Sequence, residues 1–223
     1  MNLKNKLFKF IEKKNYHNHL KILQDKGLEI NTIYDIGAHK GRWTKEHSKL
    51  FPKSNFFLFE ANQEHYKKLI TRGHKTFIGV LSSNGQDAKF YKKAGTGDSL
   101  YRENTITYSE ESFELVKTKT LHQVATDNNL PKPNFLKLDV QGAEIDILQG
   151  SGDLLDECSL ILAECPIVPY NIGAPELNDY LKYFKSIGFS PLRITEQHSH
   201  RGSLLQIDIL FLKEKTRDFL FNQ

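Results

Sequence analysis

The sequence predicts a doubly wound α/β fold, with a mostly parallel sheet of seven strands, an antiparallel last strand and helices on both faces. Three observations indicate this fold. Short apolar strands alternate with helical stretches along most of the chain, which is typical of parallel strands joined by helices. Three strands end in an acidic residue, at the edge where α/β sheets bind ligands. The last two strands follow each other without a helix, so they should pair antiparallel.

The regular alternation begins after residue 31, and its elements can be assigned in order. Apolar runs such as Phe56–Phe59 favour strands that are buried on both faces. The expected strands cover 32–36, 56–60, 76–81, 135–139, 160–164, 190–195 and 206–212. The expected helices cover 42–50, 62–72, 120–129, a stretch from about 143, and 175–187.

Residues 82–118 interrupt the alternation. Asn84-Gly85 is a hairpin signal, and the loop Gly95–Ser99 contains two glycines. We therefore expect an insertion near one edge of the sheet. The loop has two interpretations, a lid over the substrate or a mobile turn.

A helical extension is expected at 1–30, before a main domain at 31–223. A first helix at 3–14 is amphipathic, and a second helix at roughly 16–26 ends at Gly27. We expect the apolar stripe of the first helix to pack on the domain or on a second subunit. The alternative is peripheral contact with an anionic membrane through residues 1–14. The stripe consists of Leu3, Leu7, Phe10 and Ile11.

Composition and charge narrow the classes of function. The 223 residues suit one large α/β domain, and no apolar run approaches the roughly 20 residues that span a bilayer. No signal peptide is recognisable and only two cysteines occur, which predicts a cytoplasmic protein. The net charge of +4 is confined to residues 1–30. Because nucleic-acid enzymes usually carry a basic footprint on the catalytic domain, we predict a small-molecule substrate and no nucleic-acid partner.

Three strand ends carry the candidate chemistry. The loop Asp35–Gly41 follows the first strand, and its glycines let the backbone approach a ligand while the next helix offers its N-terminal amides. Glu60 lies 23 residues after Gly37, where a carboxylate can accept both hydroxyls of a ribose. Asp139 ends a third strand.

The glycine spacing separates two classes of cofactor. A dinucleotide site usually shows the closer G-x-G-x-x-G pattern, because a pyrophosphate must lie against the loop. Here three residues separate Gly37 from Gly41. That spacing favours the smaller methionine end of S-adenosylmethionine, with a nucleotide-dependent dehydrogenase as the alternative enzyme.

Several segments together resemble the FkbM family of methyltransferases, in order from about Ile33 to Leu212. The resemblance implies a class I methyltransferase (Rossmann-like) fold, S-adenosylmethionine as donor, and O-methylation of a hydroxyl of a sugar, glycan or other natural product. Gln141 departs from the pattern where many members carry Glu, as does His122 where Asp is common. The matching segments are Asp35–Gly41, Phe59–Asn62, Val80–Gly85, Lys137–Glu144 and Leu162–Glu164.

The resemblance also implies a cofactor site. Asp35 would hold the methionine amino group, directly or through water, and Glu60 would bind the ribose. Leu81 and Ser82 would lie along the adenine, and Asp139 would lie nearest the transferred methyl group. The loop residues of the site would be Gly37, Ala38, His39 and Gly41.

Methyl transfer to a hydroxyl requires that the acceptor oxygen is aligned with the methyl group. It also requires a base that removes the hydroxyl proton or a metal that acidifies it. Asp139 and Glu164, both at strand ends, are the candidate catalytic residues, and together they could hold a divalent cation. His198 and His200 are alternative bases. The structural alternative is that the carboxylates only accept hydrogen bonds in turns and the histidines face solvent. Outside enzymes, a non-catalytic S-adenosylmethionine-binding module of the same fold is the alternative.

Overall fold

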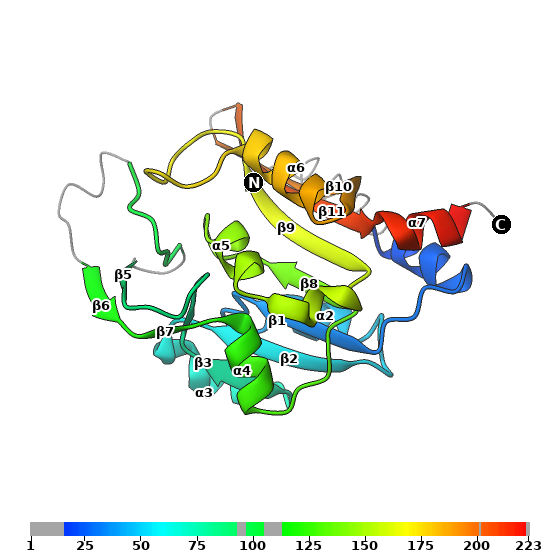
Figure 1. The fold of residues 1–223 in the computed structure, drawn as a ribbon, viewed down its shortest axis with the longest axis horizontal. Helices are drawn as coiled ribbons and strands as arrows, with labels where there is room; N and C mark the ends of the chain where they lie inside the picture. Colours follow the sequence, from blue (N-terminus) through cyan, green and yellow to red (C-terminus); the bar gives the residue numbers. More distant parts are fainter. Residues whose placement is uncertain (1–15, 93–96, 105–112, 201, 222–223) are drawn as a thin grey trace.

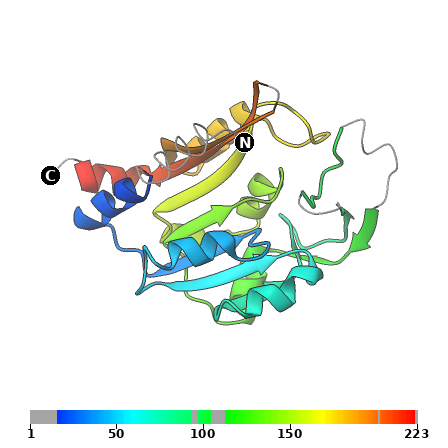
Figure 2. The same cartoon turned by 180° about the vertical axis from the view of Figure 1, so that it is seen from behind.

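A central sheet separates two layers of helices in the computed structural model, which describes residues 16–92, 97–104, 113–200 and 202–221 (Figures 1 and 2). The strands pair in parallel except around β11, which is antiparallel to both of its neighbours. This confirms the predicted fold class. The spatial order is β10 (Phe189–His200), β11 (Ser203–Lys213), β9 (Leu160–Pro166), β8 (Phe135–Leu138), β1 (Thr32–Ile36), β2 (Asn55–Glu60) and β3 (Lys75–Ile78).

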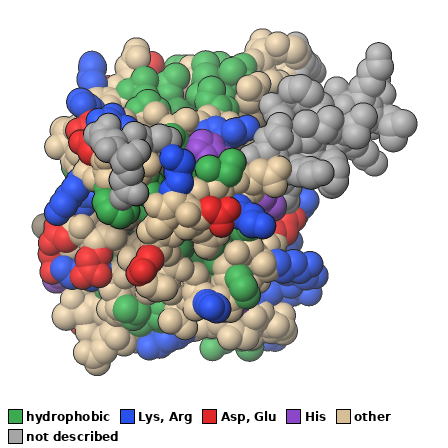
Figure 3. All heavy atoms as spheres, turned by 90° about the vertical axis from the view of Figure 1, so that its right-hand side faces the viewer, with side chains coloured by type: hydrophobic (Ala, Val, Ile, Leu, Met, Phe, Trp, Pro, Cys, Tyr) green, Lys and Arg blue, Asp and Glu red, His purple; other side chains and the backbone are tan. Residues whose placement is uncertain are grey.

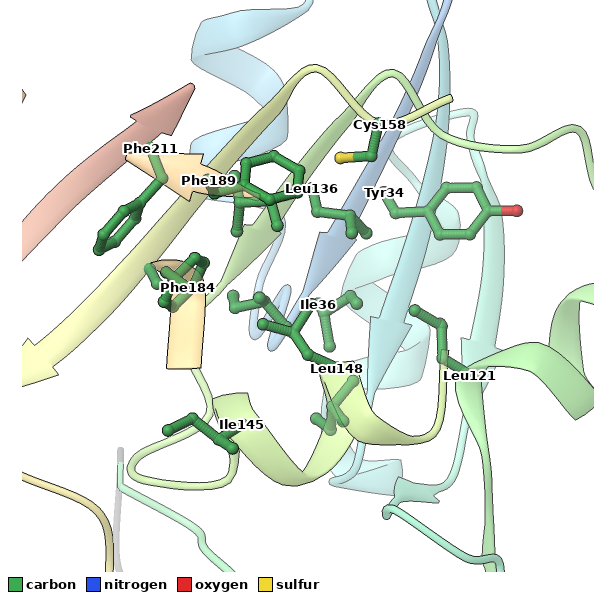
Figure 4. Packing of buried hydrophobic residues seen from close by; sticks show 14 of the residues in the cluster. Tyr34, Ile36, Leu121, Leu136, Ile145, Leu148, Cys158, Phe184, Phe189 and Phe211 are labelled. Atoms are coloured by element: carbon green, nitrogen blue, oxygen red, sulfur yellow. The ribbon is translucent and has the colours of Figure 1, made fainter. Parts of the chain in front are cut away.

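One face of the sheet is covered by α4 (Leu121–Asp127), α5 (Glu144–Gln149) and α6 (Leu177–Ser186). Alternate residues of β1, Tyr34 and Ile36, point to this side because successive side chains of a strand face opposite ways. Figure 4 shows this cluster, in which the ring of Phe184 stacks on that of Phe211 at 3.9 Å between centroids. A Thr120 capping box begins α4.

The other face is covered by a helix at 16–25, α2 (Arg42–His47), α3 (Tyr66–Ile70) and α7 (Glu214–Phe221). The helix at 16–25 and α7 lie side by side in both ribbon views, and the Lys26 ammonium donates to the Leu220 carbonyl at 3.3 Å. Leu20, Leu23 and Leu220 are buried here. The sequence pattern did not predict α7, because its apolar residues are confined to one short run at its end.

The insertion forms two small sheets beside β3, the edge strand (Figure 1). β4 (Val80–Leu81) pairs in parallel with β7 (Thr118–Lys119), and β5 (Ala88–Tyr91) pairs antiparallel with β6 (Phe113–Val116). The insertion is therefore confirmed, but the Asn84-Gly85 hairpin is wrong. Gly85 does turn the chain, at φ +70°, yet the strands before and after it pair with other partners.

The second predicted helix is confirmed at 16–25, and Gly27 follows it with a left-handed φ of +98°. The amphipathic helix at 3–14 lies outside the described residues. The domain boundary at residue 30 stays a prediction. The helices of the described part of the chain are all too short or too polar to cross a bilayer. On the face in Figure 3, the described lysine and arginine side chains are interspersed with acidic ones.

Candidate functional site

The carboxyl ends of β1, β2 and β8 open onto a cavity of about 170 Å³. One part of its wall is apolar, with Val80, Leu81, Phe90 and Ile147. The wall also has polar residues, among them His39, Glu60 and Asp139. Residues 97–100 of the insertion complete the wall.

Five of the predicted cofactor-site residues line this cavity: Gly37, His39, Glu60, Leu81 and Asp139. Four others do not. Ala38 is buried in the core with the N-terminal helix, and the Ser82 hydroxyl lies 2.6 Å from the Thr118 hydroxyl, within the β4–β7 pair. Gly41 and Asp35 also do not line the cavity. Gly41 packs against Arg72, and Asp35 forms an ion pair with Lys137.

Gly37 allows β1 and β8 to end side by side. Its φ is +74°, and a Cβ atom built at this position would lie 1.9 Å from the backbone oxygen of Asp139. No side chain fits in that space. Gly41, at φ +66°, instead makes room for Arg72, whose guanidinium donates to the Lys40 carbonyl at 2.9 Å and 3.1 Å. The two glycines therefore serve different contacts.

Glu60 is held at the end of β2 by backbone amides. Its Oε2 accepts the N–H of His39 at 2.6 Å, and its Oε1 accepts the N–H of Asn62 at 2.8 Å. Burial raises the pKa of Glu60, and these two amides oppose the shift. Each carboxylate oxygen has lone pairs beyond the one amide it accepts, and these remain available to a ligand in the cavity.

A buried lysine joins the ends of β1 and β8. The Lys137 ammonium lies 3.1 Å from Asp35 Oδ1 and 3.5 Å from Asp139 Oδ2, and it donates to the Gly37 carbonyl at 2.8 Å. Asp35 is fully buried, and its second oxygen accepts the Thr44 hydroxyl at 2.5 Å. Burial alone lowers the pKa of Lys137, but the two carboxylates outweigh it and raise the pKa. Lys137 thus links the buried Asp35 to Asp139, which lines the cavity.

Gln141 bridges the two predicted catalytic carboxylates. Its side-chain amide Nε2 lies 3.4 Å from Asp139 Oδ1 and 2.5 Å from Glu164 Oε2. Asp139 is half exposed at the cavity, whereas Glu164 is buried beside it. Burial, followed by the charges of Asp139 and Asp208, raises the pKa of Glu164 well above its ordinary value.

The loop after Asp139 is fixed from both sides. Glu144 accepts the N–H groups of Val140 at 2.9 Å and Gly142 at 3.0 Å, which is the structural role expected at a helix start. From the insertion, the Ser99 hydroxyl donates to the Gln141 carbonyl at 2.7 Å. From the segment between β9 and α6, Asn171 Nδ2 donates to the same carbonyl at 2.8 Å. The insertion therefore helps to build the site.

The two candidate histidines differ in their surroundings. His198 Nε2 lies 3.5 Å from Asp208 Oδ1, and His198, Glu164 and Asp208 form one cluster. His200 is exposed near the tip of the β10–β11 hairpin. Neither histidine lines the cavity.

Sequence reasoning missed Lys137, Asp98 and Ser99. A lysine in the middle of an apolar strand was the available signal for Lys137, because such a side chain must find a buried counter-charge. Asp98 accepts the Asn62 side-chain amide at 2.8 Å across the cavity wall. Nothing in the residue pattern of the insertion indicated that contact.

We expect Gly37→Ala to lower the free energy of unfolding by at least about 2 kcal/mol. The left-handed backbone costs a non-glycine residue about 1–2 kcal/mol, and the overlap with the Asp139 carbonyl adds roughly 1–3 kcal/mol. Gly73→Ala is the matched control, since Gly73 has φ +76° and no atom within 4 Å of the added Cβ. Urea unfolding of both variants measures the difference. Equal losses would contradict the steric argument.

Two known proteins are similar in sequence to part of this chain. The chain is 24% identical over 151 residues to the hexuronic acid methyltransferase AglP of Haloferax volcanii, and this match covers 65% of the chain and 60% of AglP. It is 25% identical over 166 residues to Methyltransferase 1 of Beauveria bassiana, covering 60% of the chain and 66% of that protein. The chain thus spans less than two thirds of the length of both relatives.

Among solved structures, magnesium protoporphyrin IX methyltransferase of Synechocystis PCC 6803 with bound S-adenosylhomocysteine shares the fold. The TM-score is 0.50 at 10% identity, over 96% of this chain and 88% of that chain. This likeness shows the fold alone. S-adenosylmethionine, rather than the nicotinamide of a dehydrogenase, fits a match to a methyltransferase family. A profile of the methyltransferase FkbM domain matches residues 35–191, more than half of the sequence. The chain belongs to the FkbM methyltransferase family.

Proposed function

We propose that this protein is an S-adenosylmethionine-dependent O-methyltransferase that acts on a hydroxyl of a sugar, glycan or other small molecule. One observation carries the proposal. The half-exposed Asp139 carboxylate stands at the end of β8, where it lines the cavity beside Gly37, and Lys137 and Gln141 hold it in place. A carboxylate so placed is suited to accept the proton of a hydroxyl. The name of AglP, a sugar methyltransferase, supports the acceptor class.

The cavity fits the parts of S-adenosylmethionine. The apolar wall around Leu81 and Phe90 suits the adenine, and the free lone pairs of Glu60 suit the ribose hydroxyls. At Gly37 the absence of a side chain lets β1 and β8 end side by side at the cavity. We place the methionine end near Gly37 and His39, with Asp35 acting through Lys137.

The bound cofactor supplies an electrophilic methyl group on a sulfonium. The protein must align the acceptor oxygen with it and remove the hydroxyl proton. Asp139 takes this proton, and Lys137 keeps its carboxylate oriented. Glu164 acts indirectly: it accepts a hydrogen bond from the Gln141 side-chain amide, which also lies beside Asp139.

The experiment has a binding arm and a transfer arm. Calorimetry with S-adenosylhomocysteine should show binding that Glu60→Ala weakens by about 1.5–3 kcal/mol, through loss of a pair of charge-assisted hydrogen bonds. Transfer of a labelled methyl group is then measured to hexosides, hexuronides and an RNA oligonucleotide, and we expect product from the sugars alone.

Three outcomes would contradict parts of the proposal. Unchanged binding by a folded Glu60→Ala would remove Glu60 from the ribose site. Binding without transfer to any acceptor would favour a non-catalytic module of the same fold. Transfer to RNA would exclude the small-molecule assignment.

A further inference from the structure

Three side chains outside the cavity form a cluster on the antiparallel edge of the sheet: Glu164 on β9, Asp208 on β11 and His198 on β10. One ligand atom from each lies within 4.8 Å of the others. Glu164 and Asp208 are directly opposite each other in the β9–β11 ladder. His198 is opposite Gln206, two residues from Asp208, so all three side chains share one face of the sheet.

The two opposed carboxylates are destabilising unless something offsets their charge. Like charges directly across a ladder repel. Glu164 is buried and Asp208 is partly buried. Burial and the neighbouring carboxylates raise the pKa of Glu164, and burial raises the pKa of Asp208 despite the nearby His198. Glu164 is satisfied by two glutamine amides, of Gln141 and Gln206. These amides are neutral, so they do not offset the charge of a carboxylate.

Asp208 supplies an independent observation. Its Oδ1 is buried and accepts no hydrogen bond from the described residues, and its neighbour is the His198 ring nitrogen at 3.5 Å. A buried polar oxygen without a donor is costly, so such an atom calls for a specific explanation. A cation at this position would coordinate the oxygen.

We propose that Glu164, His198 and Asp208 bind a divalent first-row transition metal, such as Mn²⁺ or Zn²⁺. Imidazole nitrogen with two carboxylate oxygens suits these ions, whereas Mg²⁺ and Ca²⁺ prefer oxygen alone. Ligand atoms about 2.0–2.2 Å from one ion lie up to roughly 4.4 Å apart, so small side-chain rotations complete the set.

The proposed metal site is linked to the cavity through Gln141. Gln141 joins Glu164 to Asp139, so the ion would lie one amide away from the proposed base. Binding of the ion itself does not rest on the proposed methyl transfer.

The test is binding of Mn²⁺ to the full-length chain after removal of metals with a chelator. Calorimetry and the loss of the electron paramagnetic resonance signal of free Mn²⁺ should both report one ion per chain. Mg²⁺ should compete weakly. Asp208→Asn, which keeps the side-chain shape, and His198→Ala should each weaken Mn²⁺ binding at least tenfold.

His200→Ala is the matched control, because His200 lies on the same strand outside the cluster and is exposed. It should leave Mn²⁺ affinity within twofold. Thermal unfolding of the metal-free variants verifies that they fold. Absence of stoichiometric binding by the wild type at millimolar Mn²⁺ overturns the proposal, as does unchanged affinity in a folded Asp208→Asn. Neither result would affect the binding of S-adenosylhomocysteine, so failure here is separate from failure of the proposed function.

Discussion

Replacing Lys137 with methionine is expected to lower the free energy of unfolding by about 3–5 kcal/mol, because it leaves the buried Asp35 carboxylate without its counter-charge. Methionine keeps much of the side-chain volume, so the loss is electrostatic rather than a cavity effect. The substitution also removes the donor that holds the Gly37 carbonyl. Equilibrium unfolding in urea measures the change.

Two companion variants isolate the cause. Asp35→Asn in the Lys137→Met background removes the unpaired charge, and the double-mutant cycle should give a coupling of about 1–3 kcal/mol. Lys119→Met breaks an exposed ion pair with Asp127 at 2.8 Å and should cost less than about 1 kcal/mol. If the buried and exposed lysines proved equally dispensable, Lys137 would not organise the strand ends.

Asp139→Asn is expected to reduce methyl transfer by about 10²–10⁴-fold, the usual contribution of a general base. The amide has the shape of the carboxylate but cannot take the hydroxyl proton. Because Asp139 is half exposed at the cavity rather than buried in it, binding of S-adenosylhomocysteine should change by only a few-fold. Single-turnover transfer and calorimetry on the same preparation give both values.

The control for this variant is Asp156→Asn, which alters an exposed carboxylate 3.8 Å from Lys132 on the surface. It should keep full activity. Undiminished transfer by Asp139→Asn would show that Asp139 only stabilises the turn and does not act as the base. Loss of transfer together with loss of cofactor binding would make it a cofactor-binding residue rather than the base.

The order of elements was predictable because strands that are buried on both faces have continuous apolar runs in their sequence. The runs ending at Ile36, Glu60 and Leu138 all became strands of the central sheet. The same logic failed at Asn84-Gly85. A turn signal is local, but the choice of pairing partner depends on strands more than 30 residues away, such as β7.

The strand-end residues that the sequence singled out do not all reach the cavity. Glu60 and Asp139 line the cavity, whereas Asp35 points behind it. Alternation along a strand says only that two residues lie on opposite faces. It does not predict that Lys137, on the neighbouring strand, forms an ion pair with the Asp35 carboxylate.

The sequence by itself determined the fold class, the family and the strand ends that surround the cavity, because these depend on local patterns of apolar, acidic and glycine residues. Only the tertiary structure decided which side chains meet across strands. The cluster of Glu164, His198 and Asp208 depends on the register of three strands, and β10 and β11 shift register at three irregular positions. Since a one-residue shift moves a side chain to the opposite face, residue spacing could not place His198 beside Asp208.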